Sequence, residues 1–204
     1  HFEGKESDMF VKRITSDSLI IGAPAKVNLF LQVLRRRPDG YHDLNSLFQA
    51  VSLFDRISFT LNDSPDVTIV SSRQDIGPVE HNLVTKTWKL LQARLGIKQG
   101  INVNLEKNIP VGGGLGGGSA DAAASLIAAN LLLNLQLTEF HLADIGAHIG
   151  SDVPFFFTAG QAIAQGRGEL LTETDFPTDY WIVLVTPNLQ ISTAESYASL
   201  KMTL

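Results

Sequence analysis

The sequence contains no cysteine, which excludes disulfides and thiol chemistry. It also lacks a strong excess of one charge, because 16 Lys and Arg side chains against 21 Asp and Glu give a net charge of −5. That balance argues against a nucleic-acid-binding surface. No apolar run reaches the roughly 18 residues of a membrane span, and no signal peptide is visible. We therefore expect a cytoplasmic protein.

What the sequence does contain is typical of a soluble globular protein. Hydrophobic residues make up 44% of its 204 positions and charged residues 18%, enough apolar surface for a full core. The one basic cluster is Arg35-Arg36-Arg37, and the turn signal Pro38-Asp39-Gly40 follows it directly. Three arginines before a turn are common in solvated loops, although they could also attract an anionic substrate.

Glycine is concentrated in one stretch. Six of the seven residues from 112 to 118 are glycine, although the whole chain has only 17. Just upstream, Ile101, Val103 and Leu105 alternate with polar residues, which predicts a half-buried strand. Just downstream, residues 119–134 are rich in Ala and Leu and predict a helix. A glycine loop before a helix N-terminus offers backbone N–H groups and a positive dipole end, so we predict a polyphosphate site for a nucleoside triphosphate.

Other interpretations of this loop fit the residues less well. A flexible linker usually mixes glycine with serine and does not join a strand to a strong helix. A P-loop needs lysine after its last glycine, but Gly118 is followed by Ser119. A dinucleotide fingerprint fits the glycines and would indicate an oxidoreductase, yet so glycine-dense a run fits many patterns. Its acidic partner would be Glu139, which lies at a predicted helix start rather than at the end of a strand.

Strands in the first third follow one another without helices between them, which favours antiparallel pairing and an α+β fold. Residues 22–25 are expected to interrupt the first strand, and residues 62–65 to connect two strands as a hairpin. A strand over 181–185 is expected to be buried. The expected strands cover residues 19–21, 27–34, 44–51, 57–61, 67–69, 101–105, 162–164 and 181–185.

Two further helices have clear start signals. Apolar residues at helical spacing from Leu83 to Leu95 predict a helix, with Asn82 as its N-cap and Gly96 as its stop. Thr138 is expected to cap a short helix that ends at about Gly150.

Four short motifs follow one another along the chain: PAKVNL at residues 24–29, GYH at 40–42, PVGGGLGGGSA at 110–120 and GSDVP at 150–154. Their order resembles the GHMP kinase superfamily over roughly residues 22–197. The doubled triple glycine and the Tyr-His pair resemble the branch that acts on a cytidine-diphosphate-linked methylerythritol. The resemblance implies an α+β fold, the GHMP kinase N-terminal domain of the ribosomal protein S5 domain 2-like type, with a mostly antiparallel sheet packed with helices.

The resemblance also implies an activity. It is the ATP-dependent phosphorylation of the 2-hydroxyl of that methylerythritol in the non-mevalonate route to isoprenoids, with ATP and Mg²⁺ as cofactors. The implied partner is this small molecule, with no nucleic acid or membrane and with a possible homodimer. The alternatives are another GHMP-type small-molecule kinase, or a nucleotide-binding module without turnover.

Site residues follow from the motifs that match. The resemblance assigns catalysis to Lys26 and Asp152, although Lys26 alone is typical of an exposed lysine and Asp152 alone of a turn cap. It assigns substrate binding to Asn28, Tyr41, His42 and Tyr197, with Tyr41, His42 and Tyr197 around the cytosine. It assigns no metal ligand. The ATP-binding residues are Pro110, Val111, Gly112, Gly113, Gly114, Leu115, Gly116, Gly117, Gly118, Ser119 and Ala120, with Lys107 and Asn82 around the adenine.

Three segments are expected along the chain. Residues 1–18 are interpreted as a tag remnant or a disordered tail and are left out of the fold. Residues 19–186 are the expected N-terminal ATP-binding domain. Residues 187–204 are the expected start of a C-terminal ferredoxin-like domain, which is absent or only begun in this chain.

Overall fold

Two long strands carry the fold. In the computed structural model, which describes residues 9–187, β2 (Ser18–Arg36) pairs antiparallel with β3 (His42–Asn62). The predicted interruption at residues 22–25 is wrong, because β2 runs through it with only a register shift between Pro24 and Ala25. Such a shift absorbs the missing N–H of proline without ending the strand. The strands expected over 44–51 and 57–61 are likewise one strand.

Within residues 9–187 these strands belong to a seven-stranded sheet, and the order along its main path is β1-β2-β3-β5-β4. β6 pairs with the first part of β3, on the same edge that β5 occupies farther along the strand, and β7 pairs with β6. The pairs are antiparallel except for β4 and β5, so the expected mostly antiparallel sheet is confirmed. The remaining strands are β1 (Phe10–Arg13), β4 (Val67–Ser71), β5 (Gly100–Glu106), β6 (Gln161–Gly166) and β7 (Leu170–Glu173).

The expected hairpin at residues 62–65 is wrong, because β5 lies between β3 and β4. β4 therefore pairs in parallel with β5, after the chain has crossed over through helix α1 (Leu83–Leu95). Gly100 makes this insertion possible: a Cβ there would lie 1.9 Å from the carbonyl oxygen of Asp66. The turn-forming residues at 62–65 indicated that the chain changes direction, but they did not indicate which strand would pair with β3.

The interpretation of residues 1–18 as a loose tail is wrong for residues 10–13, which form β1 at the edge of the sheet. The Phe10 ring covers Gly22, where a Cβ would lie only 2.0 Å from it, and its centroid is 5.7 Å from that of Phe54. Arg13 donates a hydrogen bond from Nη2 to the carbonyl of Leu131 at 2.8 Å. Residues 1–8 lie outside the described part of the chain.

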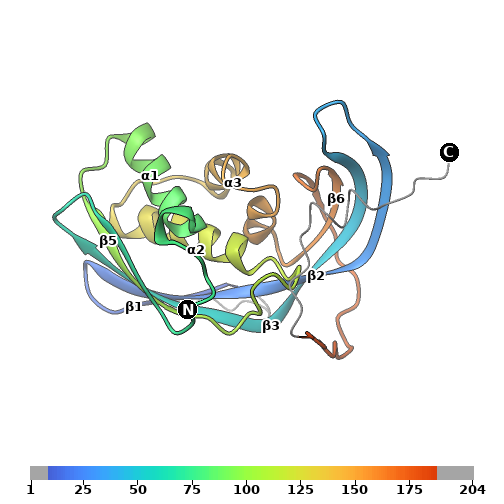
Figure 1. Ribbon diagram of the computed structural model, residues 1–204, viewed down its shortest axis with the longest axis horizontal. Helices are drawn as coiled ribbons and strands as arrows, with labels where there is room; N and C mark the ends of the chain where they lie inside the picture. Colours follow the sequence, from blue (N-terminus) through green and yellow to red (C-terminus); the bar gives the residue numbers. More distant parts are fainter. Residues whose placement is uncertain (1–8, 188–204) are drawn as a thin grey trace.

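Three α-helices cover one face of the sheet (Figure 1). The predicted caps of α1 are confirmed: Asn82 accepts from the N–H of Val84 at 2.9 Å, and Gly96 has a φ of 68°. The predicted Thr138 cap also forms, as a capping box with His141. The other helices are α2 (Gly117–Leu132), α3 (Glu139–Ala147) and the 3-10 turns η1 (Val79–His81) and η2 (Val153–Phe157). No described helix is both long and apolar enough to cross a membrane.

The core lies between the helices and the sheet. Its largest fully buried side chains include Trp88, Phe59 and Phe155. The buried strand expected over 181–185 is wrong: Trp181 is 97% exposed and Val183 84% exposed, and the segment forms no strand. Only its other face is covered, where Leu184 packs against a small apolar cluster of Ala25, Ile109 and Leu115. The segment is a continuous apolar run, but it forms no pair with a strand among the described residues.

Candidate active site

The glycine loop lines a pocket of about 390 Å³ at the N-terminus of α2. Gly112, Gly114 and Gly116 have φ of 75°, 71° and 70°, a conformation that other residues rarely adopt. Gly116 is also the N-cap of α2, and no side chain there accepts from the N–H groups of the first turn. These N–H groups are therefore available to an anion, with the positive end of the helix dipole behind them.

Close packing beneath the loop requires glycine at two positions. A Cβ on Gly116 would lie 2.8 Å from Cγ of Lys26, and one on Gly117 would lie 3.0 Å from Nζ of Lys107. A backbone hydrogen bond also holds the loop against β2, because the N–H of Lys26 donates to the carbonyl of Leu115 at 2.9 Å. The loop backbone thus packs against two lysines, Lys26 in β2 and Lys107 directly after β5.

The predicted ATP-site residues lie together, with one exception. Asn82, Lys107 and Ser119 line the same pocket as residues 110–118. Asn82 lines it while also capping α1, so its side chain has a structural role as well. Ala120 does not line the pocket and is fully buried in the core.

The two predicted catalytic residues form an ion pair at the edge of this pocket. Nζ of Lys26 lies 3.3 Å from Oδ2 of Asp152, and Asp152 lines the pocket. The Lys26 side chain is only 7% exposed, whereas that of Asp152 is 29% exposed. The lysine side chain is therefore buried, whereas the carboxylate is accessible to a ligand.

A chain of hydrogen bonds orients Lys26. Its Nζ donates to Oδ1 of Asn28 at 2.8 Å, as expected for two residues on the same face of a strand. Asn28 donates in turn to Ser46 Oγ at 2.9 Å, and Ser46 donates to the carbonyl of Phe30 at 2.5 Å. Nζ also lies 4.5 Å above the ring of Phe48. Ser46 was missed, since nothing in its local sequence distinguishes it from an ordinary strand serine.

A second lysine sits below the loop between two carboxylates. Lys107 donates from Nζ to Asp55 Oδ2, and to Asp121 Oδ2 at 2.7 Å. The other oxygen of Asp55 accepts from the N–H groups of Asn108 and Ile109 at 2.6 and 2.8 Å. Asp55 thereby fixes the segment that leads into the loop. We call Asp55, Lys107 and Asp121 the buried triad.

The buried triad has unusual protonation behaviour. Burial lowers the pKa of Lys107, but Asp121 and Asp55 outweigh it, and the pKa lies above its ordinary value. Burial raises the pKa of Asp121 to about 7, against the opposing effect of Lys107. Oδ1 of Asp121 has no hydrogen-bond partner among residues 9–187. One lysine is not enough to neutralise two buried carboxylates, so Asp121 retains a proton easily.

The predicted cytosine-binding residues lie on the hairpin formed by β2 and β3, away from the glycine loop. Tyr41 precedes β3 and is 57% exposed, and His42 begins β3 opposite Arg36. The guanidinium carbon of Arg167 lies 5.1 Å from the centre of the Tyr41 ring. Tyr197 lies outside the described residues.

The residues around the pocket can be tested for a fit to Mg²⁺. Residues 9–187 contain no cluster of three or more His, Cys, Asp or Glu side chains that could hold a metal by itself. Asp152 and Ser119 nevertheless line the phosphate pocket. Their oxygens suit Mg²⁺, which is usually held by one or two protein groups together with substrate phosphates. The residues present therefore fit a metal that arrives with a polyphosphate.

Comparisons with known proteins show which family the chain belongs to. The family described as GHMP kinases N terminal domain matches residues 82–160. The 4-diphosphocytidyl-2-C-methyl-D-erythritol kinase of Geobacter metallireducens is 45% identical over 91% of this chain, and that of a Geobacillus species is 45% identical over 90%. The chain spans 66% and 64% of the length of these two relatives.

Solved structures give the same result for the fold. A crystal structure of 4-(cytidine 5'-diphospho)-2C-methyl-D-erythritol kinase matches with a TM-score of 0.64 and 39% identity, over 78% of this chain and 56% of the other. A homoserine kinase from Cytophaga hutchinsonii matches with a TM-score of 0.68 at 21% identity, over 94% of this chain and 62% of the other. The second likeness concerns the fold alone. The chain therefore has the GHMP kinase N-terminal fold, is a homologue of the 4-diphosphocytidyl-2-C-methyl-D-erythritol kinases and belongs to the GHMP kinase family.

Proposed function

We propose that the protein transfers the γ-phosphoryl group of ATP to the 2-hydroxyl of 4-diphosphocytidyl-2-C-methyl-D-erythritol, a step in the formation of isoprenoid precursors by the non-mevalonate route. One observation carries the proposal. The Lys26–Asp152 pair lies at the edge of the pocket formed by the glycine loop. A group that can accept a hydroxyl proton and a site for the transferring phosphate are thus within one small space. The 45% identity to kinases with this substrate in their names supports the choice of substrate.

Each residue has a definite task in this reaction. Phosphoryl transfer depends on positioning and on stabilisation of charge rather than on covalent chemistry. Asp152 would accept or orient the proton of the attacking hydroxyl. Lys26, held by Asn28, would stabilise the carboxylate and the charge that develops on the phosphoryl oxygens.

The free N–H groups of the loop and of the first turn of α2 would bind the phosphates. Mg²⁺, when bound through the phosphates and oxygens such as those of Ser119 and Asp152, would offset their negative charge. The absence of a lysine in the loop itself distinguishes this site from a P-loop. The mainly antiparallel sheet also argues against the dinucleotide interpretation.

Recognition of the cytosine remains a prediction for three residues. Tyr41 offers an exposed ring for stacking, and His42 a ring nitrogen for the polar edge of the base. Tyr197 is expected on the other face of the base. A homodimer, the cytoplasmic location and the start of a second domain at residue 187 also stay predictions.

The direct test measures ADP release with Mg-ATP and the methylerythritol substrate. We expect the Asp152→Asn variant to lose about 10²- to 10⁴-fold in turnover while it still binds ATP, because only proton transfer and charge are altered. Unchanged turnover in Asp152→Asn would contradict the assigned role. If the chain does not bind ATP at all, the phosphate site itself is wrong.

A nucleotide-binding module without turnover is the second candidate, because the chain spans only about two thirds of its relatives. It predicts ATP binding without ADP release. An extended protein with the length of the relatives would then release ADP, and Asp152→Asn in that protein would not. The assay on the extended protein thus shows whether a lack of ADP release by this chain is due to a missing segment or to a wrong assignment of the reaction.

A further inference from the structure

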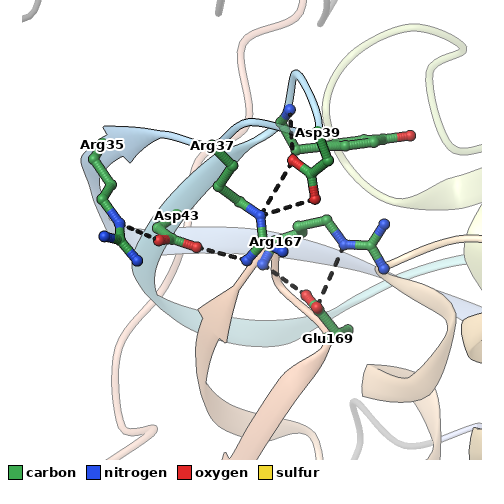
Figure 2. Close-up of polar contacts among 7 residues, drawn as sticks. Arg35, Arg37, Asp39, Asp43, Arg167 and Glu169 are labelled. Carbon is green, nitrogen blue, oxygen red and sulfur yellow. Dashed lines mark hydrogen bonds and ion pairs between the residues drawn. The ribbon is translucent and has the colours of Figure 1, made fainter.

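A cluster of charged side chains surrounds the hairpin between β2 and β3 (Figure 2). Two of its arginines pair with carboxylates of the hairpin. Arg35 Nε lies 2.6 Å from Asp43 Oδ2, and Arg37 Nη1 lies 2.8 Å from Asp43 Oδ1. Arg37 Nε is also 3.0 Å from Asp39. These pairs hold the hairpin in shape, and the charges of the two aspartates offset those of the two arginines.

Arg167 differs from these arginines in its position, because it comes from the turn between β6 and β7 and lies against the ring of Tyr41. Its Nε makes a long contact of 3.4 Å with Oε1 of Glu169, whose other oxygen accepts from the backbone N–H of Arg167 at 2.6 Å. Glu169 therefore mainly stabilises the backbone of the turn between β6 and β7. Among residues 9–187, the two terminal nitrogens of Arg167 have no hydrogen-bond acceptor, and Figure 2 shows them pointing away from Glu169. A guanidinium with two free donor nitrogens is a ready partner for a phosphate.

The position of Arg167 connects the two halves of the proposed substrate site. Its guanidinium lies against the ring of Tyr41, at 5.1 Å from the ring centre. The next residue, Gly168, has a φ of 109°, and a Cβ there would lie 3.7 Å from Oδ1 of Asp152. The turn between β6 and β7 thus contacts Tyr41 through Arg167 and passes close to the carboxylate of Asp152 at Gly168.

We propose that Arg167 binds the diphosphate of the cytidine-diphosphate-linked substrate and thereby determines its specificity. This inference rests on the proposed function, which places the cytosine at Tyr41 and the reacting hydroxyl at Asp152. The diphosphate joins these two parts of the ligand, so it must pass the turn that carries Arg167. It arrives with at least two negative charges close to Asp39, Asp43 and Glu169, and a free guanidinium offsets them.

The inference separates two contributions to affinity. Stacking on Tyr41 acts on any cytosine ligand, whereas the guanidinium acts only on ligands that carry the diphosphate. Charge-assisted hydrogen bonds of this kind change affinity by about tenfold to a hundredfold. The preference for cytidine diphosphate over cytidine is therefore the quantity that reports on Arg167.

The experiment is isothermal titration of the full chain with cytidine and with cytidine diphosphate, for the wild type, Arg167→Gln and Arg167→Lys. We expect the wild type to prefer the diphosphate, and Arg167→Gln to lose about tenfold or more of that preference with little change for cytidine. Arg167→Lys should restore part of it, because charge remains but the fork geometry is lost. Arg56→Gln is the matched control, since Arg56 is exposed on β3 opposite Gly22 and Glu106, far along the strand from the hairpin.

Each result decides between the proposals. If both ligands bind more weakly to Arg167→Gln by the same factor, Arg167 acts only through Tyr41 and the inference is wrong. If Arg167→Gln keeps the wild-type preference while circular dichroism shows it folded, the inference is again wrong but the proposed function stands. If the wild type binds neither ligand, the proposed substrate is wrong and the inference fails with it.

Discussion

The buried triad and the charged cluster on the hairpin use the same kinds of ion pair in opposite surroundings. In the buried triad, Lys107 is shared by Asp55 and Asp121, and all three are almost inaccessible to water. In the cluster, Asp43 is shared by Arg35 and Arg37, whose guanidinium groups are largely or partly exposed. The two arrangements are mirror images in charge, with one cation between two anions and one anion between two cations.

The comparison teaches that the environment decides the effect of a pair, not its geometry alone. Ion pairs in water contribute little and are screened by salt. Removing one partner of a buried pair leaves an uncompensated charge where water cannot reach it, and the cost is large. We therefore expect the triad to control stability and the cluster to control the shape and charge of a binding surface.

The largest expected effect is that of Lys107→Met. Two buried carboxylates would lose the lysine that pairs with both of them, and we expect the free energy of unfolding to fall by about 3–5 kcal/mol. Urea denaturation monitored by the fluorescence of buried Trp88 measures it. Lys86→Met is the control, because Lys86 is an exposed lysine in α1. A loss as small as that of the control would mean that the triad is no more important than a surface pair.

A smaller effect, with a characteristic pH dependence, is expected for Asp121→Asn. The pKa of Asp121 is raised to about 7, so the folded protein keeps a proton that the unfolded chain releases near pH 4. Folding stability should therefore fall as the pH rises from about 4 to about 7. Asp121→Asn removes this dependence. The stability of the variant minus that of the wild type should therefore be larger at pH 8 than at pH 5.

Urea midpoints at the two pH values measure this change, with exposed Asp144→Asn as the control. If the difference between Asp121→Asn and the wild type is the same at both pH values, Asp121 does not titrate in this range.

The smallest effect is expected for Asp43→Asn, and its pH dependence has the opposite sign. Hydrogen bonds from Arg35 and Arg37 hold the pKa of Asp43 below its usual value. Its contribution is present at neutral pH and is lost as the pH falls below about 4. We expect a small decrease in the urea midpoint at low salt and no measurable decrease in 0.5 M NaCl. An effect that persists in high salt would place Asp43 with the buried triad rather than with surface pairs.

Local features of the sequence predicted local features of the structure well. The Asn82 cap joins residues two positions apart, and the Thr138 capping box joins residues three apart, so their patterns lie within a few letters. The glycine loop and its helix were predicted for the same reason. The predicted catalytic residues Lys26 and Asp152, which form an ion pair, are far apart in sequence and were predicted from the resemblance instead.

The buried triad was missed because its members are distant in sequence. Asp55 and Lys107 are separated by 52 positions, and Lys107 and Asp121 by 14. The available signals were weak: Asp121 is a single acid among alanines in a buried helix, and Asp55 is one of two acids in β3. The same limit explains the wrong hairpin, since only the insertion of β5 separates β4 from β3.

The length of the paired strands β2 and β3 has a consequence for the ligand. Lys26 and Asn28 lie in the middle of this pair of strands, and Tyr41 and His42 at its end. A strand rises by about 3.3 Å per residue. The number of residues between these two positions therefore determines the distance from Lys26 to the hairpin. Under the proposed function, the strand pair sets the distance between the reacting end of the substrate and its base, so a much shorter ligand would not reach both.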